Sequence, residues 1–460
     1  MPAPHSLKTP YFLQQLQWVA DPVGYMEKAV QQYPDIFTAN VVGFGNNLVF
    51  VNDSQGIQEI LTNDRKKFFA SGEKNKILQP LIGDYSVMML DGDRHRKRRQ
   101  LVMPSFHGDR MRSYSQAITD ITAKVWSQLP HNQSFTARDV TQDITLQVML
   151  QTVFGVYAGE RHQQLKAQLQ RIADVFRSPL TSSLLFFPSL QKNLGAWSPW
   201  GKFLRDRQEL DNLIYAEIAE RRQQNFENRV DILSLLMSAT DEAGHPMTDQ
   251  ELRDELMTLL FAGYETTATS MAWGLYLIHK HPEVREKLLE ELDSLGDSPD
   301  PMSIFRLPYL TAVCNEILRI YPVAMLTFPR IVKEPMELLG YSLKPGTAVC
   351  GCIYLTHQRE DLYSEPKKFK PERFLERQFS PYEFIPFGGG VRRCMGEALA
   401  VFELKIVLAK IISSYQLALV DDQPEVPRRR GVTLAPGRGV TMVITGERSP
   451  QLSPVSMATS

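Results

Sequence analysis

A cysteine within a loop of glycines and arginines is the feature of this sequence best suited to chemistry. In FGGGVRRCMG, residues 387–396, Cys394 directly precedes a strongly helical segment. The helix dipole and the adjacent arginines favour a thiolate, which is a strong ligand for iron. The glycines leave room for a large flat group to approach the backbone. The loop therefore predicts a metal-bearing, negatively charged macrocycle; the alternative is a glycine-rich turn around a buried structural cysteine.

The other cysteines carry a weaker signal. The chain has four cysteines in 460 residues, far too few for a disulfide framework. Cys350 and Cys352 lie two apart in TAVCGCIYL, a pattern typical of one face of a buried strand. Since no second CxC or His pair lies nearby, we interpret them as core residues, with a zinc site as the alternative.

A long helical run is the element most able to position a site. Residues 248–251 (TDQE) form a capping box, and the helical pattern continues to Pro282. At about thirty-three residues, this helix would be on the order of 50 Å long, and its apolar middle must cross the molecule. Within AGYETT, Gly263 weakens the helix beside Thr266, whose hydroxyl can bond back onto the backbone. Threonines inside helices are usually unremarkable, so this pattern alone leaves the question open.

The remaining elements predict one mainly α domain with a small β-rich portion. Residues 36–53 have the alternation and the Gly-Asn turn of a hairpin, and residues 431–446 also read as a hairpin. Residues 307–322 and 397–415 predict helices, the first ended by a proline. Because no linker divides the chain, we expect one domain over residues 1–445 and a flexible tail at 446–460.

Composition disfavours several classes of protein. The chain is 43% hydrophobic and 22% charged, with a formal net charge of −1, which is ordinary for a globular protein. Near-neutral charge disfavours a general nucleic-acid binder. Because no apolar run reaches about eighteen residues and no signal-peptide pattern begins the chain, we expect a soluble cytoplasmic protein without a membrane anchor.

Four motifs, in order and at suitable separations, resemble those of the cytochromes P-450, the haem-thiolate monooxygenases. They are Phe-x-x-Gly-x-Arg-x-Cys-x-Gly at Phe387, Gly390, Arg392, Cys394 and Gly396; Glu-x-x-Arg at Glu316 and Arg319; PERF with Arg373; and Ala/Gly-Gly-x-Asp/Glu-Thr-Thr at Ala262, Gly263, Glu265, Thr266 and Thr267. The resemblance covers nearly the whole chain. It implies the cytochrome P-450 fold, which is mainly α with a long central helix over haem. The pattern is similar to that of soluble bacterial members of the family, including cyanobacterial ones.

The resemblance also implies residue roles. Cys394 would ligate the iron of haem b, and Glu265 and Thr266 would be the catalytic pair that passes protons to dioxygen. The other implied cofactor contacts are His95, Arg99, Ala262, Gly263, Arg330, Phe387, Gly388, Arg392 and Gly396. Four of these, His95, Arg99, Arg330 and Arg392, would face the haem propionates, since cations bind carboxylates strongly.

Glu316 and Arg319 share a helix face at spacing i, i+3. An exposed pair of this kind contributes only about 0.2–0.5 kcal/mol, and surface pairing is the simpler interpretation. The resemblance instead adds Arg373 and implies a buried structural network that fixes the cysteine loop.

The densest basic run is GDRHRKRRQ, residues 92–100. A nucleic-acid patch and a solvated face are the usual interpretations of such a run. A helix here would place His95 and Arg99 on one face and Arg94, Lys97 and Arg98 elsewhere. The latter three would either dock an acidic electron donor or form an inert solvated face.

The resemblance implies a hydroxylase that inserts one atom of O2 into a hydrophobic small molecule such as a fatty acid or terpenoid. Electrons would come from NAD(P)H through a separate ferredoxin or flavodoxin and its reductase. The pocket residues implied by position are Val87, Phe261, Leu326 and Val432, with residues 176–203 as a substrate lid. The retained acid–alcohol pair favours oxygen activation over use of peroxide. Two alternatives are an isomerase or dehydratase that needs no external electrons, and a haem-based sensor without turnover.

Overall fold

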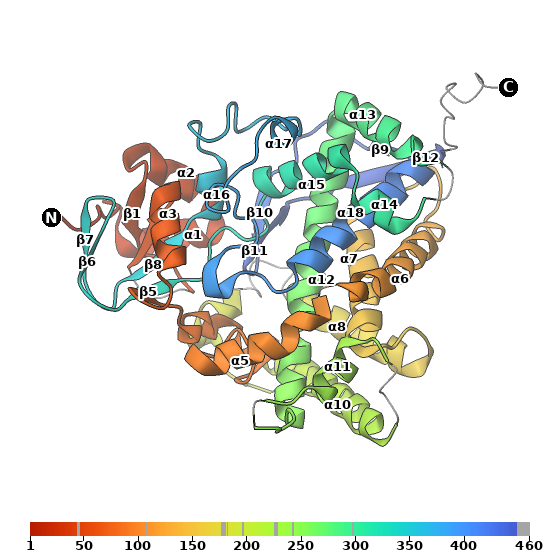
Figure 1. Ribbon diagram of the computed structural model, residues 1–460, viewed down its shortest axis with the longest axis horizontal. Helices are drawn as coiled ribbons and strands as arrows, with labels where there is room; N and C mark the ends of the chain where they lie inside the picture. The colour runs from red at the N-terminus through yellow and green to blue at the C-terminus, as the bar shows by residue number, and fades with distance from the viewer. Residues whose placement is uncertain are drawn as a thin grey trace.

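The computed structural model describes residues 1–43, 47–106, 108–175, 181, 183–195, 197–224, 229–241, 243–296 and 299–448. The fold is mainly helical with small sheets, as the sequence predicted. In Figure 1, strands β1, β5, β6, β7 and β8 lie toward the N-terminal end, and most of the helices lie on the other side. No helix in the described ranges is long and apolar enough to cross a membrane.

The helices account for most of the core. Their bounds are α1 (Tyr11–Ala20), α2 (Pro22–Gln32), α3 (Ser54–Thr62), α4 (Gln79–Ile82), α5 (Gly92–Val102), α6 (Asp109–Trp126), α7 (Ala137–Met149), α8 (Gly159–Val175), α10 (Pro199–Gln223), α11 (Ile232–Ser238), α12 (Asp249–Lys280), α13 (Pro282–Asp293), α14 (Pro301–Phe305), α15 (Pro308–Ile320), α16 (Ile353–His357), α17 (Arg373–Glu376) and α18 (Glu397–Ser414). A π-helical turn, Leu150–Phe154, extends α7.

The strands form small sheets, one strand of which, Thr433–Pro436, packs against the central helix α12. Their bounds are β1 (Ile36–Ala39), β2 (Leu48–Val51), β3 (Phe68–Phe69), β4 (Ser134–Thr136), β5 (Arg330–Val332), β6 (Met336–Leu338), β7 (Tyr341–Leu343), β8 (Ala348–Gly351), β9 (Tyr415–Leu419), β10 (Pro427–Arg430), β11 (Thr433–Pro436) and β12 (Thr441–Glu447). The largest sheet has the order β1-β2-β8-β5-β3. β1 and β2 pair antiparallel, as the first predicted hairpin requires, although its turn at residues 44–46 lies outside the described residues.

The predicted long helix is α12, and its bounds agree with the sequence. Thr248 accepts a hydrogen bond from the backbone N–H of Glu251 at 3.2 Å, and the Glu251 carboxylate accepts from the N–H of Thr248 at 3.0 Å. The helix runs for 32 residues and stops just before Pro282. Most of its length is buried, with α7 and α18 packed against it, so it crosses the middle of the molecule in Figure 1.

Two glycines of α12 allow neighbouring helices to come close. A Cβ on Gly263 would lie 2.6 Å from the sulfur of Met149 on α7. A Cβ on Gly274 would lie 2.8 Å from Leu408 on α18 and 3.1 Å from Ile317 on α15. Since real contacts of carbon atoms are longer, a larger residue at either position would force the ends of these facing side chains to move.

The second predicted hairpin, over residues 431–446, is wrong in its pairing. β11 pairs antiparallel with the preceding β10, whereas β12 pairs with β4 and β9. The turn lies instead at Gly431, which has a φ of 57° that favours glycine, and the Thr433 hydroxyl donates to the carbonyl of Arg430 at 2.9 Å. β12 extends to Glu447, two residues past the predicted domain end at 445. Residues 449–460 of the predicted tail lie outside the described residues.

Glu316, Arg319 and Arg373 come together in a buried network. The Glu316 carboxylate accepts from Arg319 at 2.6 and 2.8 Å, and from Arg373 at 3.1 Å. Arg319 also donates to the carbonyl of His357 at 2.7 Å. The His357 Nε2 accepts from the N–H of Ile385 at 3.0 Å, just before the cysteine loop. The network therefore connects α15 to the start of that loop.

Glu316→Gln should lower the free energy of unfolding by about 3–5 kcal/mol, because it leaves buried arginine charges without their carboxylate. Urea unfolding would measure this loss. Glu365→Gln is the matched control, since Glu365 pairs with Lys368 at the surface, where the two side chains are 56% and 71% exposed. The control should change stability far less, because an exposed ion pair is screened by solvent and contributes little. Equal losses in the two variants would contradict the structural role of the network.

Candidate functional site

A cavity of about 440 Å³ lies between α12, α18 and the cysteine loop. It brings together residues that are far apart in the sequence and that come from different predicted motifs. Among the predicted site residues, it is lined by Val87, His95, Arg99, Phe261, Ala262, Gly263, Glu265, Thr266, Leu326, Phe387, Gly388, Arg392, Cys394, Gly396 and Val432. Arg330 and the three residues of the buried network do not line it.

Cys394 is held at the cavity wall by the loop backbone. Its N–H donates to the carbonyl of Phe387 at 3.0 Å, which closes the loop. Gly388 has a φ of 64°, and no atom lies within 4 Å of the place where its Cβ would be. The wall beside the thiol is therefore open enough for a flat group to lie against the backbone. These features fit a cysteine-ligated haem.

The surroundings of Cys394 act on its thiol in both directions. Desolvation by the surrounding loop raises the pKa of the thiol, whereas the N–H of Gly396 and the charges of Arg99 and Arg393 lower it, as the sequence predicted for this loop. The side chain itself is exposed at the cavity wall, and ligation of a metal ion displaces the thiol proton.

His95 and Arg99 of α5 both line the cavity. Burial, together with the charges of Arg392 and Arg99, lowers the pKa of His95 to about 3, so the ring is neutral. The Arg99 side chain donates to the carbonyl of Arg393 at 2.6 Å, which joins α5 to the cysteine loop. A neutral ring N–H and a guanidinium can both donate to a carboxylate, so the pair fits the predicted propionate contact.

Arg392 binds the backbone of the segment that precedes α5. It donates to the carbonyls of Ala70 at 2.7 Å, Val87 at 3.0 Å and Leu90 at 2.6 Å, and it pairs with Asp91 at 3.1 Å. Burial lowers the pKa of Arg392 to about 10, so it stays a cation at neutral pH. These contacts hold the wall of the cavity together, and the role of Arg392 toward the propionates stays a prediction.

Arg330 lies behind the glycine loop. Its guanidinium is fully buried and pairs with Asp64 through two N–H groups, and it donates to the carbonyl of Gly389 at 3.1 Å. Asp64 in turn accepts from the N–H of Val391 at 2.7 Å. The pair therefore fixes the glycine loop at Gly389 and Val391. A propionate contact with Arg330 stays a prediction, and it would compete with Asp64.

The acid–alcohol pair on α12 is held by partners that sequence reasoning missed. One Glu265 oxygen pairs with Arg138, and the other accepts from the Gln142 side chain at 2.7 Å. The Thr266 hydroxyl donates to the carbonyl of Ala262 at 2.5 Å, one turn back, as the sequence predicted. Arg138 and Gln142 lie one turn apart on α7, and that spacing was the only signal that could have suggested a shared partner.

Glu403 is a second missed residue. It lies on α18, lines the cavity, and is fully buried, and its Oε1 has no hydrogen-bond partner among the described residues. Burial raises the pKa of Glu403 to about 8, so the carboxyl group is largely protonated at neutral pH. Its sequence signal was a glutamate within the otherwise apolar stretch AVFELKIVL.

The interpretation of Arg98 as a docking residue is wrong. Its side chain is buried, and it donates to Glu251 at 2.5 Å, to Glu255 at 3.5 Å and to the carbonyl of Tyr85 at 2.9 Å. Two glutamates of α12 thus attract this arginine inward and join α5 to α12. Arg94 and Lys97, by contrast, are exposed.

Cys350 and Cys352 are both fully buried, as predicted for core residues. Cys350 lies in β8, whereas Cys352 is just past the end of that strand, and its sulfur is 3.5 Å from the sulfur of Met26. No group of three or more His, Cys, Asp or Glu side chains gathers as a metal site anywhere in the described ranges.

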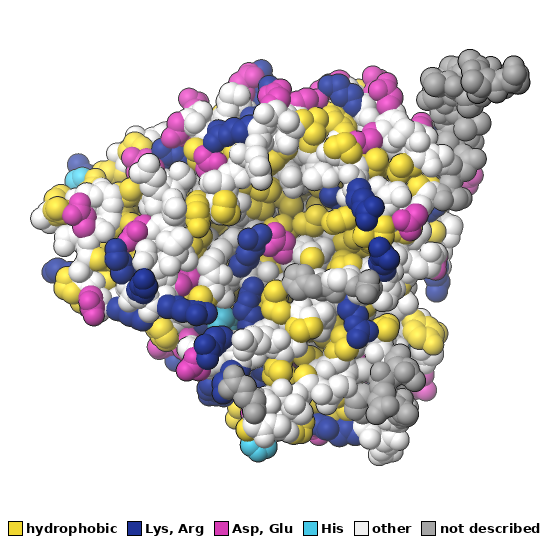
Figure 2. All heavy atoms as spheres, viewed as in Figure 1, with side chains coloured by type: hydrophobic (Ala, Val, Ile, Leu, Met, Phe, Trp, Pro, Cys, Tyr) yellow, Lys and Arg dark blue, Asp and Glu magenta, His cyan; other side chains and the backbone are white. Residues whose placement is uncertain are grey.

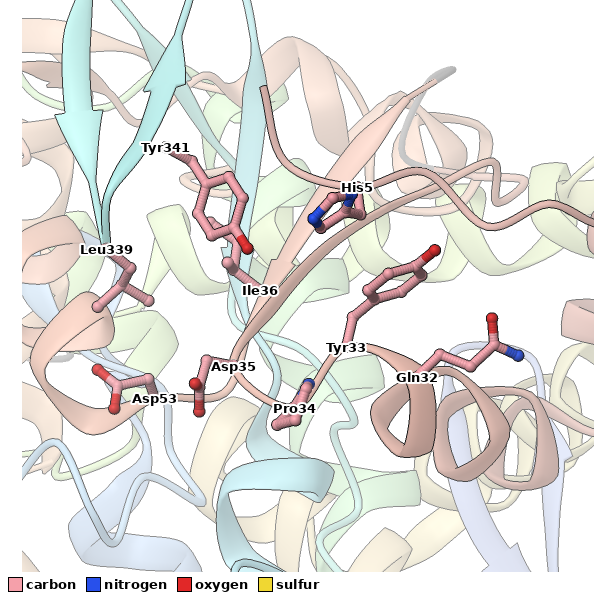
Figure 3. A pocket seen from close by; sticks show the side chains of 9 residues that line it. All are labelled: His5, Gln32, Tyr33, Pro34, Asp35, Ile36, Asp53, Leu339 and Tyr341. Carbon is pink, nitrogen blue, oxygen red and sulfur yellow. The ribbon is translucent and has the colours of Figure 1, made fainter. Parts of the chain in front are cut away.

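A second pocket, of about 510 Å³, lies at the N-terminal edge and has a structural explanation (Figure 3). The ring of His5 stacks on Tyr33 with 5.0 Å between centroids, and it meets Tyr341 edge-on at 5.8 Å. The two carboxylates are already engaged, because Asp35 pairs with Arg359 at 2.7 Å and Asp53 caps α3. The ring contacts of His5 thus hold the N-terminal segment against Tyr33 and β7. The residues that line this pocket offer no set of chemical groups comparable to that of the first cavity.

The predicted lid is described only in part, since residues 176–180, 182 and 196 lie outside the described residues. Phe186 and Trp200 are buried, whereas Trp197 is 81% exposed. The Arg429 guanidinium lies over the ring of Phe186, 4.3 Å from its centroid. Leu185 lines the cavity, so this segment contributes to its wall.

Comparisons with family models, curated proteins and solved structures all point to the same family. The model of the family "Cytochrome P450" matches residues 2–442. Cytochrome P450 135B1 of Mycobacterium tuberculosis is 35% identical over 437 residues, covering 95% of this chain and 89% of that protein. Cytochrome P450 135A1 of the same organism is 31% identical, covering 97% and 96%. The structure titled "Retinoic acid bound cyanobacterial CYP120A1" has a TM-score of 0.85 at 24% identity, covering 97% of this chain and 99% of that chain.

Cys394→Ser should abolish the strongly red-shifted Soret band of the reduced, CO-bound protein, because that band requires a thiolate ligand. Absorption spectra of the purified variant would show this. Cys350→Ser and Cys352→Ser are the controls, and both should keep the band wherever they fold. A Cys394→Ser protein that retained the band would contradict the assignment of the ligand.

Glu403→Gln should change how stability depends on pH. The pKa of this carboxyl is about 8 in the folded protein, against an ordinary value of 4.5. The stability that the raised pKa contributes is fully present below pH 4.5 and is lost as pH rises to about 8. Between these values, wild type should therefore lose on the order of 5 kcal/mol relative to the variant. Urea unfolding of both proteins across this range would measure it, and a pH-independent difference would contradict the buried acid.

Proposed function

Because this chain belongs to the cytochrome P450 family, a family of haem monooxygenases, we propose that it inserts one atom of O2 into a hydrophobic small molecule and reduces the other atom to water. The observation that carries this proposal is the convergence of Cys394, Thr266 and a largely apolar wall on one cavity. In the proposed reaction the cysteine would hold the iron, the alcohol would deliver protons, and the apolar side chains would bind the substrate.

We propose that the cofactor is haem b. The Cys394 sulfur would hold the iron, Gly388 and Gly396 would let the ring lie against the loop, and His95, Arg99 and Arg392 would bind its carboxylates. When bound, this group supplies the activation of O2 and the transfer of the oxygen atom. The positions of these residues around one cavity support the proposal.

In the proposed reaction, Glu265 and Thr266 move protons toward the oxygen. The Thr266 Oγ1 can accept from a water molecule, and it can donate into the cavity once its bond to the Ala262 carbonyl is released. Glu265 is held by Arg138 and Gln142, so its carboxylate must leave Arg138 before it can carry a proton. The ion pair between Arg138 and Glu265 would therefore control when a proton passes from Glu265 into the cavity.

The apolar side chains of the cavity, including Val87, Phe261, Leu326 and Val432, would exclude water and bind an apolar substrate. The segment that contains Leu185 and Phe186 would act as the lid, and it already covers part of the cavity. A fatty acid or a terpenoid has the required apolar body.

We further propose that electrons arrive from NAD(P)H through a separate ferredoxin or flavodoxin and its reductase. Figure 2 shows Lys and Arg side chains gathered around the position of α5 on one face of the molecule. On α5 itself Arg94, Arg96 and Lys97 are exposed, as is Arg393 in the cysteine loop. A basic surface next to the cysteine loop suits an acidic carrier.

Thr266→Ala should uncouple the reaction. The loss of one small hydroxyl costs only about 1 kcal/mol, so folding and substrate binding should remain near normal. NAD(P)H consumption should continue while hydroxylated product falls and hydrogen peroxide rises, as measured by the ratio of product to NAD(P)H consumed.

Thr269→Ala is the matched control for this experiment. Thr269 is buried on the same helix and does not line the cavity, so its removal should leave the coupling ratio unchanged. Unchanged coupling in Thr266→Ala as well would remove Thr266 from the proposed proton route.

A further inference from the structure

The N-terminal helix α1 presents apolar side chains to solvent. A surface helix normally turns its apolar face inward, but the buried face of α1 consists of Gln14 and Trp18, which lie one turn apart. The Gln14 side chain accepts from the Tyr25 hydroxyl at 2.9 Å, and the Trp18 ring meets that of Tyr25 edge-on at 6.0 Å. These contacts fix the rotation of the helix. Phe12 and Leu16, on its opposite face, are therefore 61% and 59% exposed.

The proposed lid lies beside α1 and also exposes apolar side chains. The buried Arg429 joins the two segments, because its guanidinium donates to the carbonyl of Val19 on α1 at 3.1 Å and lies over the ring of Phe186, 4.3 Å from the centroid. Further along the lid, Leu194 and Trp197 are 56% and 81% exposed. Two neighbouring segments that are far apart in the sequence therefore both present apolar side chains to solvent.

These segments concentrate the exposed apolar side chains of the protein. Residues 11–16 and 190–197 hold seven of the sixteen large apolar side chains that are exposed on the described parts of the chain. Exposed apolar side chains that stand singly need no partner, whereas a concentration of them marks a binding surface. We name this set the apolar surface and define it by Phe12, Leu16, Leu194 and Trp197.

The charge of the same segments favours an anionic partner. Neither residues 1–20 nor residues 175–205 contain an Asp or Glu, although these acids make up 52 of the 460 residues. Lys8, Lys192 and Lys202, which lie within those stretches, are all exposed. Apolar and aromatic side chains bordered by lysines are typical of segments that rest among the headgroups of an anionic bilayer. Tryptophan suits that region because it joins an apolar body to a polar N–H.

We propose that the apolar surface binds the face of a lipid bilayer that carries anionic headgroups, so that the protein attaches to it peripherally. Such attachment inserts side chains only to the depth of the headgroups and needs no spanning helix. Leu185 of the lid lines the cavity, so the bound bilayer would lie next to the cavity wall. Hydrophobic molecules dissolved in the bilayer would then reach the cavity without crossing water. The inference goes beyond the proposed function, because binding of a bilayer does not depend on the reaction.

The test measures binding of the full-length, haem-loaded protein to vesicles of two compositions: phosphatidylglycerol and phosphatidylcholine in equal parts, and phosphatidylcholine alone. We expect the protein to float with the first vesicles in a density gradient, to bind the second much less, and to be released by added salt. Trp197 reports the contact directly, because the other four tryptophans are buried. Its emission should shift to the blue on the first vesicles and should be quenched by brominated lipid.

Variants then assign the binding to the apolar surface. Leu16→Ser and Trp197→Ser should each lower the partition coefficient about tenfold, since each removes one large apolar side chain from the bilayer. Leu375→Ser is the matched control, because Leu375 is 52% exposed on α17, outside the apolar surface, and this variant should bind as wild type does. Lys192→Gln should weaken binding to the phosphatidylglycerol vesicles about fivefold. Trp197→Phe should keep most of the binding and lose the blue shift.

Three results would overturn the inference. The first is that wild type does not bind the phosphatidylglycerol vesicles, or binds both compositions equally. The second is an equal loss of binding in Leu16→Ser and Leu375→Ser. The third is self-association without vesicles, measured by sedimentation velocity, that Leu16→Ser abolishes while vesicle binding persists, because the apolar surface would then bind a second copy of the chain. The CO-bound spectrum of each variant would show that its haem site is intact, so none of these results bears on the proposed reaction.

Discussion

The buried bonds between arginines and the backbone are the interaction on which the rest of the structure depends. A glycine-rich loop cannot hold a cysteine in place by its own side chains, because it has few of them. Here Arg319 reaches the loop through His357, whose ring accepts from Ile385. Arg330 donates to the carbonyl of Gly389 within the loop, and Arg392, which is part of the loop, donates to the carbonyl of Val87 in the segment before α5. Each of these cations is costly to bury, and each offsets that cost by bonding to backbone carbonyl groups or to a carboxylate.

The second constraint is the close packing of α12 against α7. Gly263 allows the two helices to approach, and the same approach brings Arg138 and Gln142 within reach of Glu265. One small residue thus positions a carboxylate that lies two places further along the helix. A change at Gly263 that moved α7 outward would disturb the acid as well as the packing, although it touches no reacting group.

The sequence was most informative where the signal lay within one segment. The capping box at Thr248, the periodicity of α12 and the glycine loop around Cys394 all have local causes, and the structure agrees with their positions. Pairing across segments could not be predicted. The strand at residues 441–447 joined β4 and β9 because alternation shows a strand without naming its partner. Arg98 turned inward because two glutamates of a distant helix face it, and Glu403 entered the cavity only when the chain folded.

The contact between Met149 and Gly263 also gives the site a chemical weakness. Met149 lines the cavity, and its sulfur lies where not even one added carbon on Gly263 would fit. A thioether exposed to hydrogen peroxide gains an oxygen atom and becomes bulkier and polar. An oxidised Met149 would have to move from its place against Gly263. Under the proposed reaction, peroxide released inside the cavity would therefore act first on the contact between α7 and α12, the two helices that also carry Arg138 and Glu265.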